Sequence, residues 1–413
     1  MRNMGSLSKL ADGFMERFRA RISIFLSCFL ERKRREMVIL PDDVIIQILA
    51  ALPVKSIGRF KAVSKSWKSL LSSYYFALTH CSLSTSQALC LLLQGPYNDQ
   101  EMFYASAENF NEFCLCSSKK TGFQHQGLKW VACHNGIVCC LVISKTEGSL
   151  FFIGNPLTQR EFVALPKLKF QVRYSFGFYF DTINQKFKIL AITGSEIGTY
   201  LIFDSSIGEW GFPRNQPPYD KYCRGWVLSV GSACYVYSPY TLYTQGIDHL
   251  MCFDMEREEW EIIHTPIWLT SSCSYEIQER DGRLCIIQVT LDEIAQAHIW
   301  VLLQEKKWVH LMKIDLGQFG FHKLKQLGVA FEELCIRPEF LIGHTFLLNI
   351  LTIGDHSELV PSWREQVGSW IVAYNRRSRK LGKMVQNART RFFMYQPTLF
   401  TCKMEKDGKI HLG

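Results

Sequence analysis

Cysteine and histidine are the side chains of this sequence with the most versatile chemistry, and five of them follow one another over a short stretch. These candidate metal ligands are Cys114, Cys116, His125, Cys133 and His134. Structural zinc sites place cysteines about two to four residues apart and add a second such pair. The first two cysteines have one residue between them, and in a strand both thiols would point to the same face. We therefore predict core or edge positions for these five residues and no metal site.

Thioester formation is a second chemistry that cysteine supports, and it needs a thiol whose pKa is lowered by polar, basic surroundings. Most cysteines here lie in apolar segments typical of buried strands, such as Cys139, Cys140, Cys234, Cys252 and Cys285. The sequence also lacks the zinc-protease, phosphate-loop, dinucleotide-binding and nucleophile-elbow motifs. We predict no catalytic residue and no cofactor, and we do not expect an enzyme.

Basic residues gather at the N-terminus. The chain has 413 residues and a formal net charge of +9, and residues 1–36 carry nine Lys or Arg against four Asp or Glu. The rest of the chain is nearly balanced in charge, so no nucleic-acid partner is predicted. The run Arg32–Arg35 fits a nuclear import signal, a membrane-surface patch or a solvated linker. The run Arg376–Lys380 fits an exposed hairpin loop, and a loop that binds a phosphorylated target is the alternative.

Cysteine usage and hydropathy indicate the compartment. Fifteen cysteines, an odd number without a secretory leader, indicate reduced thiols in the nucleus and/or the cytoplasm. No run reaches the ~18 apolar residues that a membrane span needs, and the early apolar run Ile22–Leu30 is followed by a charge cluster. We therefore predict no membrane partner. An Arg-rich transit peptide to an organelle is the alternative for this N-terminal segment.

Residues 38–80 have the pattern of short helices. Pro41 followed by Asp42 and Asp43 is typical of a helix start, because proline fits the first turn and acidic residues complement the helix dipole. Apolar residues then recur with helical spacing as far as Leu52.

Two further helices are expected after Pro53, which ends the first. The second runs from about Val54 to Ala62, and the third covers Lys65–Ser72 with Ser64 as its N-cap. Three short helices cannot enclose a core of their own. We therefore expect their apolar faces to meet a partner or the rest of the chain.

Short strands and turns follow from about residue 87, and their pattern repeats. Four apolar strands, each followed by a polar turn and an aromatic residue, contain Phe152, Phe203, Phe253 and Leu302, at intervals of 51, 50 and 49 residues. A period near ~50 residues with four strands per unit is typical of a kelch-type β-propeller blade. A β-sandwich with irregular spacing is the alternative.

Additional strands complete each repeat unit. Gly136, Gly231 and Gly282 each open a strand that precedes one of the hairpins. A fifth unit ends at Trp370–Tyr374, and residues 315–365 are interpreted as a long insert in it.

Two stretches resemble known domains. The motifs Leu40-Pro41-Asp42-Asp43, Leu52-Pro53-Val54-Lys55-Ser56 and Val63-Ser64-Lys65-Ser66-Trp67 together resemble an F-box of the plant type. The segments His134–Cys139, Gly154–Phe162 and Gly177–Asp181 resemble the F-box-associated domain that follows it in a large plant family.

The resemblance and the repeats together predict a mainly β protein with a small N-terminal α domain. Residues 1–36 are predicted to be a basic N-terminal extension, flexible or partly helical, and residues 38–80 a three-helix F-box. Residues 87–402 are predicted to be an F-box-associated, kelch-like β-propeller of five or six blades.

The resemblance implies a substrate-recognition subunit of a Skp–cullin–F-box type E3 ubiquitin ligase. In that family the F-box binds the Skp adaptor, and through it the cullin and RING subunits, while the C-terminal domain binds a target protein for ubiquitination and proteasomal degradation. The residues implied to bind the adaptor are Leu40, Pro41, Ile45, Leu49, Leu52, Pro53, Val54, Ile57, Val63 and Trp67. No target-binding residue is assigned.

The sequence departs from the family at Gly58, where leucine is common. Glycine within a helix costs about 1 kcal/mol of helix propensity and removes an apolar contact, so weaker adaptor binding is expected. The alternative from another functional class is a β-propeller enzyme or a carbohydrate-binding propeller with a helical leader.

Overall fold

The chain divides into two compact units, residues 1–48 and residues 49–413. The computed structural model describes residues 41–83, 89–93, 101–106, 119–124, 128–144, 148–158, 162–193, 199–218, 226–237, 249–266, 274–280, 282–290, 296–315, 334–342, 345–353, 366–375, 380–381, 385–386, 391–396, 398–404 and 410–412. The predicted extension at 1–36 and residue Leu40 lie outside these ranges.

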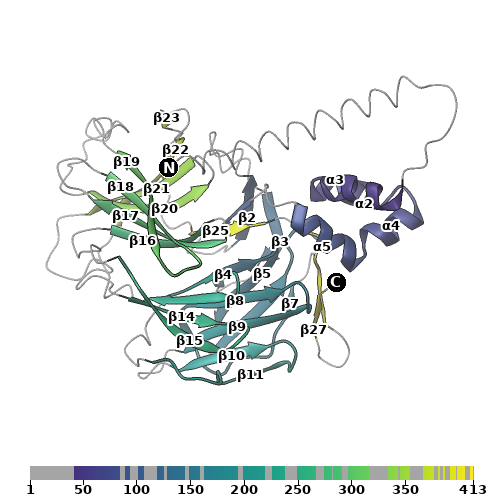
Figure 1. Ribbon diagram of the computed structural model, residues 1–413, viewed down its shortest axis with the longest axis horizontal. Helices are drawn as coiled ribbons and strands as arrows, with labels where there is room; N and C mark the ends of the chain where they lie inside the picture. The colour runs from purple at the N-terminus through teal and green to yellow at the C-terminus, as the bar shows by residue number, and fades with distance from the viewer. Residues whose placement is uncertain are drawn as a thin grey trace. The chain divides into compact units, whose positions relative to one another are not determined.

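Four helices are described, one more than the sequence predicts (Figure 1). They are α2 (Asp42–Ala50), α3 (Val54–Phe60), α4 (Lys65–Leu71) and α5 (Tyr74–Leu83). The predicted N-cap is confirmed, since Ser64 Oγ accepts a hydrogen bond of 3.1 Å from the backbone N–H of Trp67. The backbone carbonyl of Pro53 accepts from the N–H of Ser56 at 2.8 Å, so this proline begins α3 directly after α2 has ended.

Most strands form four-stranded antiparallel sheets, which we call blades and number along the chain. Blade 1 contains β1 (Leu89–Leu93), β2 (Glu101–Ser106), β3 (Lys119–Gln124) and β25 (Arg391–Tyr395), and blade 2 contains β4 (Leu128–His134), β5 (Ile137–Ser144), β6 (Gly148–Gly154) and β7 (Val163–Ala164). Blade 3 contains β8 (Val172–Asp181), β9 (Lys186–Thr193), β10 (Tyr200–Asp204) and β11 (Glu209–Gly211), and blade 4 contains β12 (Trp226–Val230), β13 (Ala233–Tyr237), β14 (His249–Asp254) and β15 (Glu259–His264). Blade 5 contains β16 (Ser274–Arg280), β17 (Arg283–Thr290), β18 (Gln296–Leu302) and β19 (Trp308–Asp315). Blade 6 contains β20 (Leu334–Ile342), β21 (Thr345–Ile353), β22 (Gln366–Asn375), β23 (Lys380–Leu381) and β24 (Val385–Gln386), and β26 (Cys402–Met404) pairs with β27 (Ile410–Leu412).

The edge strands of successive blades contact one another. β25 contacts β4, and contacts continue from β4 to β8, to β12, to β16 and to β20. A series of four-stranded sheets joined through their first strands is the arrangement of a β-propeller. Within the described residues the blades number six, the larger of the two predicted values.

The last strand of the propeller, β25, belongs to the first blade. It pairs antiparallel with β1 over five residues, so that Leu91 lies opposite Phe393. A propeller closed in this way joins the two ends of its chain through the hydrogen bonds of one sheet.

The predicted repeat coincides with the blade. Phe152, Phe203, Phe253 and Leu302 lie on β6, β10, β14 and β18, which are the third strands of blades 2 to 5. The glycines predicted to open strands all precede second strands and have positive φ. One interpretation of the sequence is wrong: residues 315–365, taken as an insert, contain β20 and β21.

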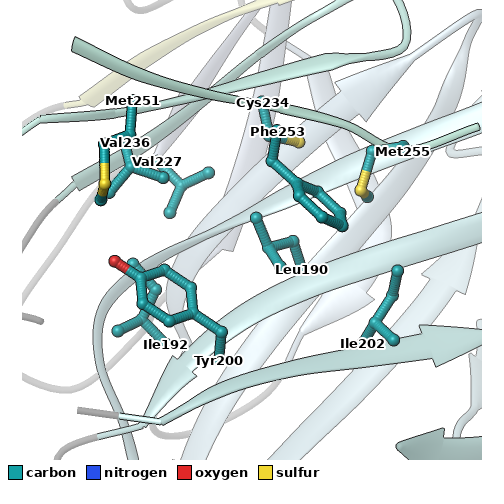
Figure 2. Packing of buried hydrophobic residues seen from close by; sticks show 10 residues of the cluster. All are labelled: Leu190, Ile192, Tyr200, Ile202, Val227, Cys234, Val236, Met251, Phe253 and Met255. Atoms are coloured by element: carbon teal, nitrogen blue, oxygen red, sulfur yellow. The ribbon is translucent and has the colours of Figure 1, made fainter. Parts of the chain in front are cut away.

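The core lies between neighbouring blades. Leu190, Ile192, Tyr200 and Ile202 of blade 3 pack against apolar residues of blade 4 (Figure 2). Those residues of blade 4 are Val227, Cys234, Val236, Met251, Phe253 and Met255. Successive side chains of a strand point to opposite faces, and the alternate residues of β14, Leu250 and Cys252, accordingly belong to the cluster shared with blade 5. Both faces of a blade are therefore apolar, which explains the continuous apolar runs in the sequence.

Tryptophans on the fourth strands join blades 3, 4 and 5 to the blade before each of them. The Nε1–H of Trp210 donates to the backbone carbonyl of Pro166 at 2.9 Å, and that of Trp260 donates to the carbonyl of Asn215 at 3.0 Å. Trp308 donates in the same way to His264 at 2.7 Å. The aromatic residue after each turn, a repeat visible in the sequence, thus fixes the contact between blades.

Candidate protein-docking site

The residues implied to bind an adaptor differ in their exposure. Leu40 lies outside the described residues. Pro41, Pro53 and Val63 are exposed, Ile45, Leu52, Val54 and Trp67 are half-buried, and Leu49 and Ile57 are buried. At 4 % and 0 % exposed, the two buried residues support the helices from within, whereas the other described residues are available for contact.

The turn between α3 and α4 presents the most exposed apolar residue of the predicted set. Val63 is 63 % exposed, and Trp67 packs on Phe60 with ring centroids 5.6 Å apart. Val44 on α2 is also 40 % exposed, although the predicted set does not include it. An exposed valine gains apolar burial when a protein docks on it. Within the unit that begins at Leu49, Val63 and Trp67 therefore make the segment from α3 to α4 a candidate docking site.

Gly58 lies on the exposed side of α3, and a methyl group added there would have no heavy atom within 4 Å. Replacing Gly58 with Ala is therefore expected to raise the free energy of unfolding by about 0.5–1 kcal/mol, because alanine loses less backbone entropy in a helix. Urea denaturation measures this change. Gly136→Ala is the matched control, since φ at Gly136 is +75° and the added Cβ would lie 2.0 Å from Thr398 Oγ1. A lower stability of Gly58→Ala would contradict the expectation.

Helix α5 is the element that the sequence analysis does not predict. Phe76, Ala77 and His80 are buried, and Ser73 Oγ caps the helix by accepting from the N–H of Phe76 at 3.2 Å. His80 Nε2 lies 3.1 Å from the carbonyl of Leu52, at the end of the preceding helical segment. The packing of α5 therefore involves the helices before it.

The same helix also contacts the propeller. The hydroxyl of Tyr74 donates to the carbonyl of Thr182, in the turn between β8 and β9, and its ring lies 5.6 Å from that of Phe400. Burial, together with the nearby Asp181 carboxylate, raises the pKa of Tyr74 to about 12, so the hydroxyl keeps its proton and remains a donor. Gln396 Nε2 donates to the carbonyl of Cys81 at 3.2 Å. Helix α5 thus connects the helical segment to blade 3 and to the C-terminal segment.

Residues 395–396 and 398–402 contact the turns of blade 2, and Asn155 holds them there. The Asn155 side chain is fully buried, and its amide donates to the carbonyls of Thr398 and Phe400 at 3.0 and 2.8 Å. Its Oδ1 accepts from the hydroxyl of Tyr395 at 2.7 Å and from the N–H of Leu157 at 3.0 Å. Asn155 belongs to the motif Gly154–Phe162, which carries part of the family resemblance. Its role there is structural, because it holds the C-terminal segment against blade 2.

His134, considered above as a metal ligand, makes a backbone contact with blade 3. The N–H of Phe180 lies 3.0 Å from its Nδ1, while the carbonyl of Phe180 accepts from the amide of Asn135 at 3.2 Å. Burial lowers the pKa of His134 to about 4 from an ordinary value of 6.5. The ring is therefore neutral near pH 7, and its Nδ1 joins the two blades through the backbone of Phe180.

Acid is expected to weaken the folded state through this histidine. The unfolded chain takes up a proton at His134 near pH 6.5 and the folded chain only near pH 4, so stability falls as the pH falls through this window. Between about pH 7 and pH 5 the expected loss is about 2 kcal/mol. Urea denaturation at both pH values measures it, and His134→Gln should flatten the dependence by that amount. An unchanged pH dependence in the variant would exclude this role.

Cys81, Cys139 and Cys140 have the surroundings of unreactive thiols. Burial raises the pKa of Cys81 to about 11 and those of Cys139 and Cys140 well above their ordinary value. Among the residues that the structure describes, no three His, Cys, Asp or Glu side chains are placed to share a metal ion. The candidates Cys114, Cys116 and His125 lie outside those residues, as do 376–379 of the second basic run. No described helix is long and apolar enough to span a membrane.

Comparison with known protein families identifies both parts of the chain. Residues 38–79 match the F-box domain family, and residues 90–330 match the family described as F-box associated beta propeller domain. The second match covers more than half of the chain. It includes blades 2 to 5, whose repeat the sequence reveals.

Individual relatives agree with these matches. A protein of Arabidopsis thaliana named as an F-box protein is 29 % identical over 300 residues, which are 65 % of this chain and 72 % of the relative. A second such protein from the same plant is 26 % identical over 310 residues, covering 72 % and 77 % of the two chains.

Solved structures resemble the chain only distantly. A TolB structure from Agrobacterium tumefaciens has a TM-score of 0.38 at 9 % identity, covering 79 % of this chain and 96 % of that one. The β-propeller domain of the Trilobed protease from Pyrococcus furiosus has a TM-score of 0.32 at 8 % identity, covering 69 % and 91 %. The assignment therefore rests on the strand topology and the family matches, and the chain belongs to the plant F-box proteins that carry a C-terminal F-box associated β-propeller domain.

Proposed function

We propose that the protein is the substrate-recognition subunit of a Skp–cullin–F-box type E3 ubiquitin ligase, acting in the nucleus and/or the cytoplasm. The helical segment binds the Skp adaptor, which brings the cullin and RING subunits. The propeller binds a target protein for ubiquitination and proteasomal degradation. The observation that carries the proposal is the exposure of apolar residues, above all Val63, within the segment that matches the F-box family.

In this proposal the subunit contributes no catalytic group. It holds the target near a ubiquitin-loaded enzyme elsewhere in the complex, which replaces a bimolecular encounter by a reaction at high effective concentration. Effective concentration depends on the stiffness of the connection. The contacts of α5 with Thr182 and Phe400 support a stiff connection between α5 and the propeller.

The connections between strands favour one end of the propeller for the target. In an antiparallel blade, the turns after the first and third strands lie at the same end. The turns of blades 2 and 3 at this end include Asn135, Asn155 and Thr182, which contact α5 or the C-terminal segment. We therefore place the target at the opposite end, where the second strands of the blades connect to the third.

Adaptor binding is the test of this function. Replacing Val63 with Asp places a charge on an exposed apolar position. The fold is retained because the residue is exposed, whereas the docking surface loses its apolar character. Binding of a purified Skp adaptor, measured by calorimetry, is expected to weaken by about tenfold or more, as one desolvated charge costs at least 1.4 kcal/mol.

Ile207→Asp is the matched control, because Ile207 is 72 % exposed in the turn between β10 and β11. It should leave adaptor affinity unchanged. The double substitution of Leu52 and Trp67 by Ala, which removes the half-buried contacts, should also weaken binding. Wild-type affinity in Val63→Asp, or no adaptor binding by the wild-type chain, would refute the proposal.

A further inference from the structure

Blade 5 carries two histidines in direct contact on its outer strands. His298 lies on β18 and His310 on β19, and His298 Nδ1 is 3.2 Å from His310 Nε2. The ring centroids are 5.3 Å apart with an angle of 43° between the planes. His310 is exposed and His298 is half-buried, so solvent reaches the pair.

An irregularity in the sheet brings these rings together. In the ladder between the two strands, Ile299 lies opposite Met312, whereas the next residue, Trp300, lies opposite His310. Leu311 is therefore an extra residue without a partner in the ladder, as in a β-bulge. Bulges re-aim neighbouring side chains. Here the bulge places His310 near His298, whose direct partner in the ladder is Lys313.

The spacing of the two nitrogens suits a metal ion. Zinc binds imidazole nitrogen at about 2.0–2.1 Å, so two nitrogens on one tetrahedral ion lie about 3.3 Å apart. The observed 3.2 Å also suits a hydrogen bond in which one ring donates its proton to the other. A metal ion would take the place of that shared proton.

The surroundings of the pair include an aromatic ring and a positive charge. Trp300 lies against the pair, with its ring centroid 4.4 Å from that of His310. The opposing feature is the Lys313 ammonium, whose positive charge repels a cation.

We propose that His298 and His310 form a surface site for a divalent transition metal ion of the imidazole-binding class, represented by Zn²⁺, with two coordination positions left open to water. Borderline ions such as Zn²⁺ and Ni²⁺ accept imidazole readily. The proposal is independent of the F-box function.

Metal binding by the full chain tests the proposal, with Zn²⁺ and Ni²⁺ as the probes. Titration calorimetry on the reduced wild-type protein near pH 7.5 is expected to detect a site that is lost in His310→Ala and in His298→Ala. Each variant should bind at least about tenfold more weakly, because a single imidazole remains. Ni²⁺ should also quench tryptophan fluorescence, and Trp300→Phe should remove most of that change.

Two further variants make the test specific. His249 and His264 lie opposite each other on β14 and β15, so their double replacement by Ala is the matched control and should leave binding unchanged. Lys313→Gln removes the repelling charge and should tighten binding severalfold. Equal affinity in wild type and His310→Ala would overturn the proposal. Loss of the site in the His249 and His264 control would overturn it as well.

Discussion

Replacing Asn155 with Ala is expected to lower the free energy of unfolding by about 3–5 kcal/mol. The fully buried side chain makes four hydrogen bonds, two as donor to the carbonyls of Thr398 and Phe400 and two as acceptor. A buried polar group left without a partner costs about 1–3 kcal/mol, and the truncation leaves several such groups. Urea denaturation of the full chain measures the loss.

The Asn155→Ala substitution should also affect α5, although this helix lies far from Asn155 in the sequence. Residues 398–400, once released, no longer hold the ring of Phe400 against Tyr74, so α5 should become more susceptible to limited proteolysis. Asn184→Ala is the matched control, since this asparagine is exposed and bonds within its own turn to Asp181. A loss below about 1 kcal/mol in Asn155→Ala would show that the C-terminal segment is held by other contacts.

Replacing Trp260 with Ala is expected to cost about 2–4 kcal/mol, the second large effect. The indole packs on Tyr200 of the preceding blade and on Phe253 of its own, with ring centroids 4.9 and 4.7 Å apart. Removal leaves a cavity between blades 3 and 4 in addition to the lost transfer free energy. Thermal and urea unfolding both report the change.

Trp260→Phe separates packing from hydrogen bonding. Phenylalanine keeps most of the apolar contact and loses only the bond to the carbonyl of Asn215, so a cost of about 1 kcal/mol is expected. If both variants lose the same stability, the hydrogen bond carries the contact between the blades, and the packing argument fails.

Local pattern predicted the repeating hairpins of blades 2 to 5. Phe152, Phe203 and Phe253 recur at almost constant intervals because each blade repeats one hairpin, and the structure places all three on third strands. The cap at Ser64 was equally predictable, because a capping side chain bonds only three residues along the chain.

Elements stabilised by distant residues escaped prediction. Helix α5 has no amphipathic pattern because it contacts Leu52 on one side and Thr182 and Phe400 on another. The closing strand β25 pairs with β1, some 300 residues earlier, and no local spacing records that pairing.

The candidate docking site was predictable only in part. Leu49 and Ile57 have the same apolar character and helical spacing as Leu52, yet both are buried within the chain. A short helix shows the same periodicity whether its apolar face meets its own chain or another protein. Exposure, which distinguishes Val63 from Ile57, depends on tertiary packing and had to come from the structure.

The bond between Gln396 and Cys81 joins residues 315 positions apart, and this separation sets an order of events during synthesis. Ribosomes add about 5–20 residues each second, so α5 waits roughly 15–60 s for the segment that anchors it. The strand β25, which closes the ring, ends one residue before Gln396 and is therefore made at the same time. A chain that stops early therefore has neither a closed propeller nor a fully anchored α5. Synthesis of residues 391–396 is thus the step that both closes the propeller and anchors α5 to it.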